Sequence, residues 1–477
     1  MHPAPSTPHL AGSRLPAVPT LDRAIGPVAA TLLVIGGIIG SGIFLTTGIM
    51  AAALPSPTLL LVAWAAGGLF ALAGALSYAE LAAMYPRAGG VYVYLKEAFG
   101  SLPAFLYGWA MLLIALSGGV AAVAVGFADY LSYFIPAWSH AHVLITVRVG
   151  DWAWSLSAGQ LVAVGSIVLL GGVNYLGVRF GAGTNGVLTI AKIAGLVLLP
   201  IFALTAARVT PAWTPIVPPD LGSPLVAFGV AMIAVLWAND GFYFLTYSAG
   251  EVRDPARNLP RALTFGLLTV IAVYLTVNAA YLVALPIDEL ARTSRVAERA
   301  ATALVGAAGA TIVSLTVVVS TLGCNAAAIL GASRLLYAMA ADGLFFKAAA
   351  LVHPKHRSPH IAILALTIWS SLLALSGSYQ QLFTYVVFTS VLFSLLGGLA
   401  LFRLRISRPA AERPYRVWGY PVVPALFVLG SFFVVINTLR ERPFESMAGL
   451  GLLAIGFPVY LYWSKSPNPQ IPKSSNS

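Results

Sequence analysis

The sequence has little charge. Only 9% of its 477 residues are Asp, Glu, Lys or Arg, whereas 59% are hydrophobic and the mean hydropathy is +0.86. A soluble globular domain carries about 25% charged residues. The shortage of charge therefore excludes a large water-soluble domain and indicates one polytopic domain embedded in a lipid bilayer.

Cysteine is nearly absent, since Cys324 is the only one and lies in an apolar stretch. A single cysteine excludes an intramolecular disulfide and a cysteine-based metal site. We also expect no disulfide-linked ancillary subunit, because no external loop carries a cysteine. The histidines all fall in tails or loops, and the sequence shows no catalytic constellation. We therefore expect no metal, no cofactor and no enzymatic activity.

The excess of basic residues gives a net charge of +11. These residues are scattered through short loops between apolar segments, which argues against nucleic acid as a partner and is typical of membrane topology. When the N-terminus is placed inside, most Lys and Arg residues fall in inside loops. The sequence therefore predicts cytoplasmic termini, and the compact loops favour a prokaryotic plasma (inner) membrane.

The apolar stretches are long enough to span a membrane many times, since one helix requires about 20 apolar residues. We expect twelve segments, near residues 27–53, 57–83, 103–135, 158–176, 184–206, 224–248, 262–286, 301–338, 360–377, 381–402, 419–438 and 446–464. Residues 1–23 read as a disordered cytoplasmic N-terminal tail, and residues 465–477 as a short cytoplasmic tail.

Four glycines and a serine interrupt the first segment between Gly36 and Gly42. Each glycine costs about 1 kcal/mol relative to alanine inside a helix, so we expect this helix to break. In lipid, broken backbone is tolerated only where it is buried in protein or lines a cavity. Such breaks form the substrate sites of secondary transporters. The alternative is that these glycines pack helix against helix.

A second predicted break lies in the sixth segment, where Asn239, Asp240 and Gly241 stand together in apolar sequence. Segments one and six are five apart, and matched broken segments in two halves indicate an inverted-repeat transporter. We expect one repeat over residues 24–206 and the other over 223–403. Residues 419–464 would then form two helices outside the repeats.

Four motifs follow one another along most of the chain. They are Gly37 to Phe44, Pro86 to Tyr94 with Glu97 to Gly100, Gly250 to Pro255 with Arg257 to Ala262, and Ser333 to Tyr337 with Asp342 and Gly343. In these motifs the chain resembles the amino acid–polyamine–organocation (APC) transporters, and most closely their L-type amino acid transporter branch. The resemblance implies an all-α, LeuT-type 5+5 fold with broken helices 1 and 6, amino acid transport, and a loop after segment two that folds back toward the membrane.

The resemblance also implies a substrate site. Ile38, Ser41 and Gly42 match positions that bind the substrate α-carboxylate, and Ile39 and Gly40 lie in the same unwound stretch. Backbone amides and the N-terminus of the following half-helix both favour an anion.

In segment six, Trp237 and Ala238 match positions whose carbonyl groups take the substrate amino group, and the Trp237 ring would cover the substrate. Gly241 belongs to the same break. Asp240 departs from the family pattern, which often has glycine there. Asp240 is open to three interpretations: a cap for the broken helix, a proton or substrate group, or an exposed position.

Lys192 lies in the middle of segment five, and family members of this branch carry a lysine there. The resemblance implies that its ammonium group occupies the place where related transporters hold Na⁺. It would connect carbonyl groups near Gly36 and Gly37 to hydroxyl groups such as Ser320 or Thr321. A proton-coupling role for Lys192 remains the alternative.

Two other acidic residues, Glu80 and Asp129, fall near the ends of segments two and three. We interpret both as interface residues and assign them no role.

The sequence thus predicts a secondary transporter that moves L-amino acids, preferably neutral ones, as an exchanger or a proton symporter. A permease for cationic amino acids or polyamines is the alternative, because Asp240 is the one acid near the site. A transport-inactive amino acid sensor is a further alternative. The expected partners are an amino acid, the bilayer and, in the symporter case, protons.

Overall fold

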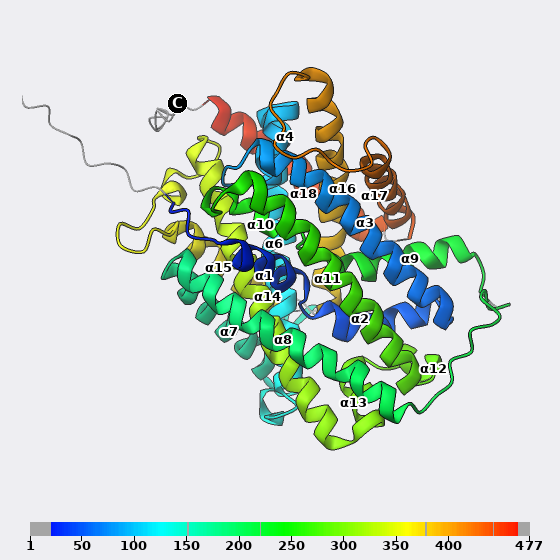
Figure 1. The fold of residues 1–477 in the computed structure, drawn as a ribbon. Helices are drawn as coiled ribbons and strands as arrows, with labels where there is room; N and C mark the ends of the chain where they lie inside the picture. The colour runs from blue at the N-terminus through cyan, green and yellow to red at the C-terminus, as the bar shows by residue number, and fades with distance from the viewer. Residues whose placement is uncertain (1–20, 150–151, 220, 377–378, 442, 466–477) are drawn as a thin grey trace, which may run out of the picture.

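The computed structural model describes residues 21–149, 152–219, 221–376, 379–441 and 443–465. The expected terminal tails therefore lie almost wholly outside the described residues. The described chain is a bundle of long helices with one short hairpin (Figure 1).

The helices of the first part are α1 (Pro27–Ile38), α2 (Gly42–Ala53), α3 (Pro57–Met84), α4 (Val91–Phe99), α5 (Ser101–Ala110), the π-helical turn η1 (Met111–Ala115), α6 (Leu116–Leu131), the 3-10 turn η2 (Pro136–Trp138), α7 (Ala158–Tyr175) and α8 (Val178–Ala206). Those of the second part are α9 (Pro224–Asn239), α10 (Phe244–Tyr247), η3 (Ala249–Glu251), α11 (Pro255–Ala284), α12 (Ile287–Ala291), α13 (Val296–Val305), α14 (Ala307–Ala341), η4 (Lys347–Ala350), α15 (His360–Ser376), α16 (Tyr379–Ser407), α17 (Val422–Glu441) and α18 (Pro443–Lys465).

Nine stretches of helix in the described part are long and apolar enough to cross a membrane, counting α1 with α2 as one stretch and α5, η1 and α6 as another. Three shorter apolar helical stretches accompany them, at Pro224–Asn239, His360–Ser376 and Gly449–Ser464. The prediction of a helical protein with many possible membrane spans is therefore confirmed.

The helices differ in how deeply they are buried. In α1 with α2, in α5 through α6, and in α14, about four-fifths of the most apolar window is buried inside the protein. In α8 and α17 only 33% of the window is buried, so most of their apolar surface faces outward. The first three stretches therefore form the centre of the bundle, where α6, α14 and α1 lie close together (Figure 1).

Two of the differences from the predicted segment boundaries have a local cause in the sequence. The expected segment 301–338 is divided at Gly306, whose φ of 78° lies in the left-handed region, so α13 ends there and α14 starts a new direction. The expected segment 262–286 begins earlier, at Pro255, because proline is well accommodated in the first turn of a helix.

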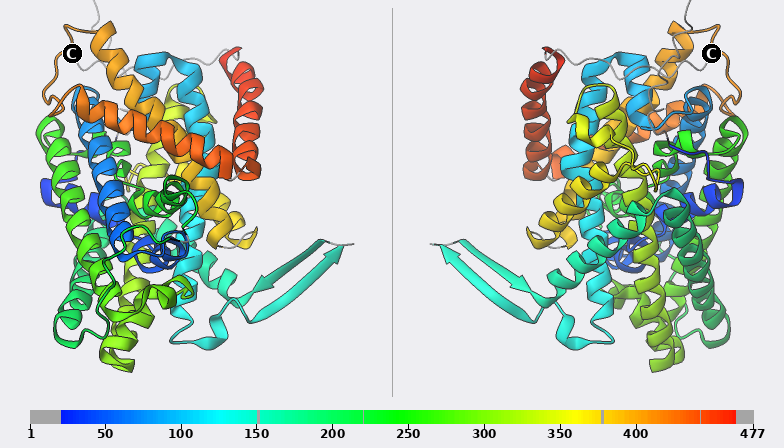
Figure 2. Two further views of the ribbon diagram at one scale, coloured as in Figure 1. Left: turned by 90° about the vertical axis from the view of Figure 1, so that its right-hand side faces the viewer. Right: turned by 90° about the vertical axis from the view of Figure 1, so that its left-hand side faces the viewer.

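A two-stranded antiparallel hairpin corrects the all-α expectation. Strands β1 (Val143–Val149) and β2 (Trp152–Ser157) pair between α6 and α7. Figure 2 shows this hairpin projecting from the side of the helical body. Each strand is short and alternates its side chains between two faces, so the hairpin leaves no long apolar run in the sequence.

The loop after α3 carries the short helix α4 back against the bundle. Residues Val91 to Leu95 of α4 are all buried. The backbone N–H of Gly89, just before this helix, donates to the Tyr247 carbonyl of α10 at 3.0 Å. The loop is thereby attached to the end of the second interrupted helix.

Candidate functional site

The site begins where α1 ends at Ile38 and α2 starts at Gly42. Residues 39–41 between the two helices are all buried. Because the helix stops here, the carbonyl groups at its end have no helical N–H donor. Buried backbone groups require hydrogen-bond partners. Here the partners are side chains from three other helices.

Lys192 of α8 is fully buried and supplies the first of these partners. Its ammonium Nζ donates to the carbonyl oxygens of Gly36 at 3.0 Å and Ile39 at 2.5 Å. The Ser320 hydroxyl of α14 also donates to the Ile39 carbonyl, at 3.1 Å, so the two side chains meet on one oxygen. Thr321 instead donates to carbonyl groups of its own helix and makes no such contact.

Tyr274 of α11 bridges both interruptions, and the sequence analysis did not select it. Its hydroxyl lies 2.9 Å from the Ala238 carbonyl of α9 and 3.2 Å from the Ile38 carbonyl of α1. The Cys324 thiol of α14 donates to the Gly37 carbonyl at 3.2 Å. Donors from α8, α11 and α14 thus hold the carbonyl groups at the end of α1.

The second interruption separates α9, which ends at Asn239, from α10, which starts at Phe244. Gly241 has a φ of 92°, a left-handed conformation that a side chain would strain. Local backbone bonds close the turn, since the Asp240 N–H donates to the Trp237 carbonyl at 3.2 Å and the Phe244 N–H to the Gly241 carbonyl at 3.0 Å.

The two interruptions touch at Gly42 and Ala238. A Cβ atom built on Gly42 would lie only 2.6 Å from the Ala238 Cα. A side chain at position 42 would therefore push the interrupted helices apart, and glycine permits this close approach.

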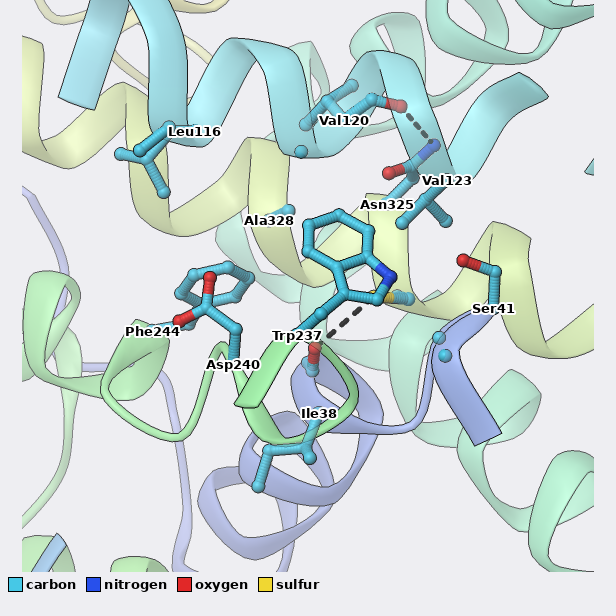
Figure 3. A pocket seen from close by; sticks show the side chains of 16 residues that line it. Ile38, Ser41, Leu116, Val120, Val123, Trp237, Asp240, Phe244, Asn325 and Ala328 are labelled. Carbon is cyan, nitrogen blue, oxygen red and sulfur yellow. Dashed lines mark hydrogen bonds between the residues drawn. The ribbon is translucent and has the colours of Figure 1, made fainter. Parts of the chain in front are cut away.

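A cavity opens between the two interruptions, α6 and α14, beside the Trp237 ring (Figure 3). The lining residues are Gly37, Ile38, Gly40, Ser41, Gly42, Ala115, Leu116, Gly119, Val120, Val123, Trp237, Asp240, Phe244, Cys324, Asn325 and Ala328. Water centres can occupy about 40 Å³ of it, and one water needs about 10–15 Å³ by this measure. The space therefore holds about three water molecules, so only a small ligand would fit without movement of the lining.

The predicted substrate residues fall into two groups around this cavity. Ile38, Gly40, Ser41, Gly42, Trp237 and Asp240 line it. Ile39, Ala238 and Gly241 lie in the same two interruptions behind the lining, and Lys192 with Ser320 lies behind Ile39. Most of the lining is apolar, with a few polar groups, as is typical of small-molecule sites.

Asp240 lies between this cavity and a smaller one bounded by α3, α9 and α16. Its carboxylate accepts a hydrogen bond from the Ser390 hydroxyl of α16 at 3.4 Å. In Figure 3 the carboxylate stands beside Phe244, on the other side of the Trp237 ring from Ser41. Asp240 is partly exposed to the cavity, so it offers negative charge to one end of the cavity.

Two motifs meet in a buried ion pair outside the cavity. The Arg334 guanidinium of α14 and the Glu251 carboxylate of η3 are both completely buried and form two hydrogen bonds, at 2.6 and 3.1 Å. Next to Glu251, Ile25 pairs with Val252 in an isolated parallel bridge. The ion pair thus joins α14 to η3, and the bridge joins the chain before α1 to the chain after η3.

Glu80 lies near the end of α3, and its side chain is fully buried within the protein. It accepts two hydrogen bonds from Arg405 of α16, at 2.6 and 2.9 Å, and one from the Val417 N–H at 2.7 Å. The Arg413 guanidinium lies 3.3 Å away. The partners are more than 300 residues distant in sequence, so no local signal could reveal them.

The comparison with known proteins now gives the family. The model of the amino acid permease family matches residues 25–449, which include both interruptions and every helix that lines the cavity. The chain belongs to the amino acid permease family. The APC resemblance seen in the sequence is thereby confirmed.

Relatives of this permease are similar over nearly their whole length. The serine/threonine exchanger SteT of Bacillus subtilis is 30% identical over 443 residues, which cover 92% of this chain and 96% of SteT. The branched-chain amino acid permease BcaP of the same organism is 31% identical over 425 residues, 88% of each chain. The human b(0,+)-type amino acid transporter 1 is 29% identical over 438 residues, 90% of this chain and 85% of that one. All three are named as transporters rather than enzymes.

Proposed function

We propose that this permease moves neutral L-amino acids across the plasma membrane by alternating access, with the substrate bound between the α1/α2 and α9/α10 interruptions. The observation that carries the proposal is the meeting of two interrupted helices beside one small cavity. In membrane transporters such half-helix ends hold charged groups of the substrate and of coupling ions.

The transmembrane arrangement that we propose has twelve spans. The nine long apolar stretches and the three shorter ones follow the order of the twelve predicted segments. The first five would form one repeat, the next five an inverted copy, and the last two would lie outside, as in the LeuT-type fold. The distribution of Lys and Arg over the loops supports cytoplasmic termini.

The zwitterionic head group of the substrate has complementary surroundings. The start of α2 at Gly42 favours the carboxylate, because a helix N-terminus presents N–H groups and a positive dipole end. The end of α9 presents carbonyl groups to the ammonium group. Trp237 would cover the substrate, and Ser41 would add a hydroxyl group. A small substrate agrees with the limited space, and SteT is named for two small amino acids.

Lys192 would act as a built-in cation at the α1/α2 interruption. Its two carbonyl contacts and the neighbouring Ser320 support that role. If Lys192 stays charged throughout the transport cycle, amino acid exchange is favoured. If Lys192 releases its proton during the cycle, proton symport is favoured. The single, buried Cys324 supports a permease that acts without a disulfide-linked subunit.

One observation favours a second substrate class. The partly exposed Asp240 carboxylate at the cavity would suit the positive side chain of a cationic amino acid or a polyamine. A transport-inactive sensor would use the same site, but it would bind substrate without flux.

Reconstituted transport separates these alternatives. Purified permease in liposomes preloaded with serine is assayed for uptake of labelled serine, leucine and lysine, with and without an inward proton gradient. We expect uptake of the neutral amino acids that requires internal substrate and ignores the gradient. Uptake that requires the gradient in empty liposomes would make the protein a proton symporter, and preference for lysine would establish the cationic class. Saturable binding without flux would identify a sensor.

A further inference from the structure

Asn325 of α14 lines the cavity with half of its amide group unpaired. Its Nδ2 donates to the Val120 carbonyl of α6 at 3.1 Å, while its Oδ1 is buried and has no hydrogen-bond partner among the described residues. The residue as a whole is 2% exposed. A buried acceptor without a partner is unfavourable. The described residues hold other such amide oxygens, those of Asn174 and Asn239, but of these three asparagines only Asn325 lines the cavity.

The bond to Val120 fixes the direction of the free oxygen. An amide group is planar, so anchoring its nitrogen on α6 sets where Oδ1 points. Figure 3 shows the amide next to the Trp237 ring and Val123, within the cavity lining. The amide therefore belongs to the cavity wall, with its oxygen buried in that wall.

The wall around Asn325 offers little other polarity. Leu116, Val123 and Ala328 contribute hydrocarbon from the same two helices, and the Asp240 carboxylate lies beyond Trp237. An acceptor in an apolar wall increases the affinity for a ligand that places a hydrogen-bond donor there. It also discriminates strongly against a ligand of similar shape without the donor, because that ligand leaves the oxygen unpaired.

We propose that Asn325 Oδ1 accepts a hydrogen bond from the side-chain hydroxyl of a small hydroxy amino acid, serine or threonine. This rests on the proposed function, in which the interrupted helices hold the head group, and it requires the substrate side chain to point toward α6 and α14. The permease then prefers serine to alanine and threonine to 2-aminobutyrate, pairs that differ in each case mainly by a hydroxyl group.

The test compares these pairs in liposomes containing the full-length permease. Asn325→Leu keeps the approximate size and removes both the acceptor and the donor to Val120, whereas Asn325→Asp removes the donor but retains oxygen acceptors. Asn174→Leu is the matched control: Asn174 of α7 is also buried with an unpaired Oδ1 and also contacts α14, through the Ala326 carbonyl, but it does not line the cavity.

We expect Asn325→Leu to lower the serine-to-alanine ratio of kcat/KM about tenfold, the effect of one lost hydrogen bond to a buried group. The threonine-to-2-aminobutyrate ratio should fall equally, with alanine transport preserved. Asn325→Asp, whose carboxylate can still accept from a hydroxyl group but is not anchored on Val120, should lose less of the preference than Asn325→Leu. Asn174→Leu should change both members of each pair alike.

Equal losses for serine and alanine in Asn325→Leu would overturn the proposal, because the oxygen would then serve the shared ammonium group or the fold. A wild-type protein without preference for the hydroxy amino acids would also overturn it. If Asn325→Leu does not fold, Asn325→Ala takes its place. If the wild-type protein transports nothing, the proposed function fails, and thermal stabilisation by serine against alanine then tests Asn325 separately.

Discussion

The two interrupted helices are held in different ways. At the α1/α2 interruption, side chains of α8, α11 and α14 occupy the carbonyl groups, and Lys192 is the only charged one among these donors. At the α9/α10 interruption, backbone hydrogen bonds and the conformation of Gly241 close the turn itself, and Tyr274 contacts only the Ala238 carbonyl at the end of α9. Its side chains Trp237 and Asp240 remain directed to the cavity.

This difference suggests that the α1/α2 interruption mainly holds the shape of the site, whereas the α9/α10 interruption mainly selects the substrate. Because the first interruption depends on three other helices, its geometry should respond to changes far from the substrate. Because the second is closed locally, changes to its side chains should alter which substrate binds more than whether the site forms. The following variants test this division.

The largest effect is expected from Gly42→Val, where the two interruptions touch. A side chain there would collide with the Ala238 backbone, since even a Cβ atom would lie 2.6 Å from its Cα. We expect transport to be abolished in protein that still inserts, measured as uptake into liposomes. Gly172→Val in α7 is the control, because a Cβ atom there meets no atom within 4 Å. Near-normal uptake by Gly42→Val would disprove the assignment of the site.

Lys192→Ala should have the next largest effect, because it leaves the Gly36 and Ile39 carbonyl groups without their charged donor. Hydrogen bonds to charged groups contribute about 1.5–3 kcal/mol each, so we expect at least a tenfold fall in kcat with substrate binding partly retained. Lys347→Ala, in the exposed part of η4, is the matched control. Wild-type rates in Lys192→Ala would leave the lysine with a purely structural role.

Tyr274→Phe tests whether one hydroxyl couples the two interruptions. The ring and its edge contact with Trp64, at 5.3 Å between centroids, remain. The one hydroxyl hydrogen that the Ile38 and Ala238 carbonyl groups share is lost, and at about 0.5–1.5 kcal/mol for a neutral hydrogen bond this predicts a several-fold loss of transport rate. Tyr281→Phe, which loses a single bond to the Ile43 carbonyl, should be affected less. Equal rates in the two variants would argue against coupling through Tyr274.

Asp240→Asn should have the smallest effect on neutral substrates. The amide can still accept the hydrogen bond from Ser390, so we expect serine uptake within about threefold of wild type, the scale of one neutral hydrogen bond. Inhibition of serine uptake by lysine should weaken more than inhibition by alanine. A loss of serine uptake as large as that of Lys192→Ala would give Asp240 a role in coupling instead.

The class of the protein could be predicted from sequence because its signals are local. Low charge and repeated apolar segments indicate membrane helices wherever they occur, and the ordered motifs carry the family. The β1–β2 hairpin and the separation of α13 from α14 at Gly306 were missed. Both depend on short stretches that a search for long apolar runs passes over.

The site shows the same limit at the level of side chains. Glycines and an acidic residue in apolar sequence indicate the two interruptions, because both are unfavourable inside a membrane helix and can be recognised from the sequence alone. Tyr274, Asn325 and Glu80 give no such signal. Tyrosine and asparagine are ordinary in membrane helices, and the partners of Glu80 lie far along the chain, so only the folded arrangement reveals their contacts.

The buried ammonium of Lys192 has an electrical consequence. A free ion that accompanied the substrate would carry its charge across the membrane voltage, worth about 2.3 kcal/mol per 100 mV. The charge of Lys192 belongs to the chain and returns with it. If Lys192 stays protonated, a cycle that exchanges one zwitterion for another moves no net charge, and a potassium diffusion potential should leave the exchange rate unchanged.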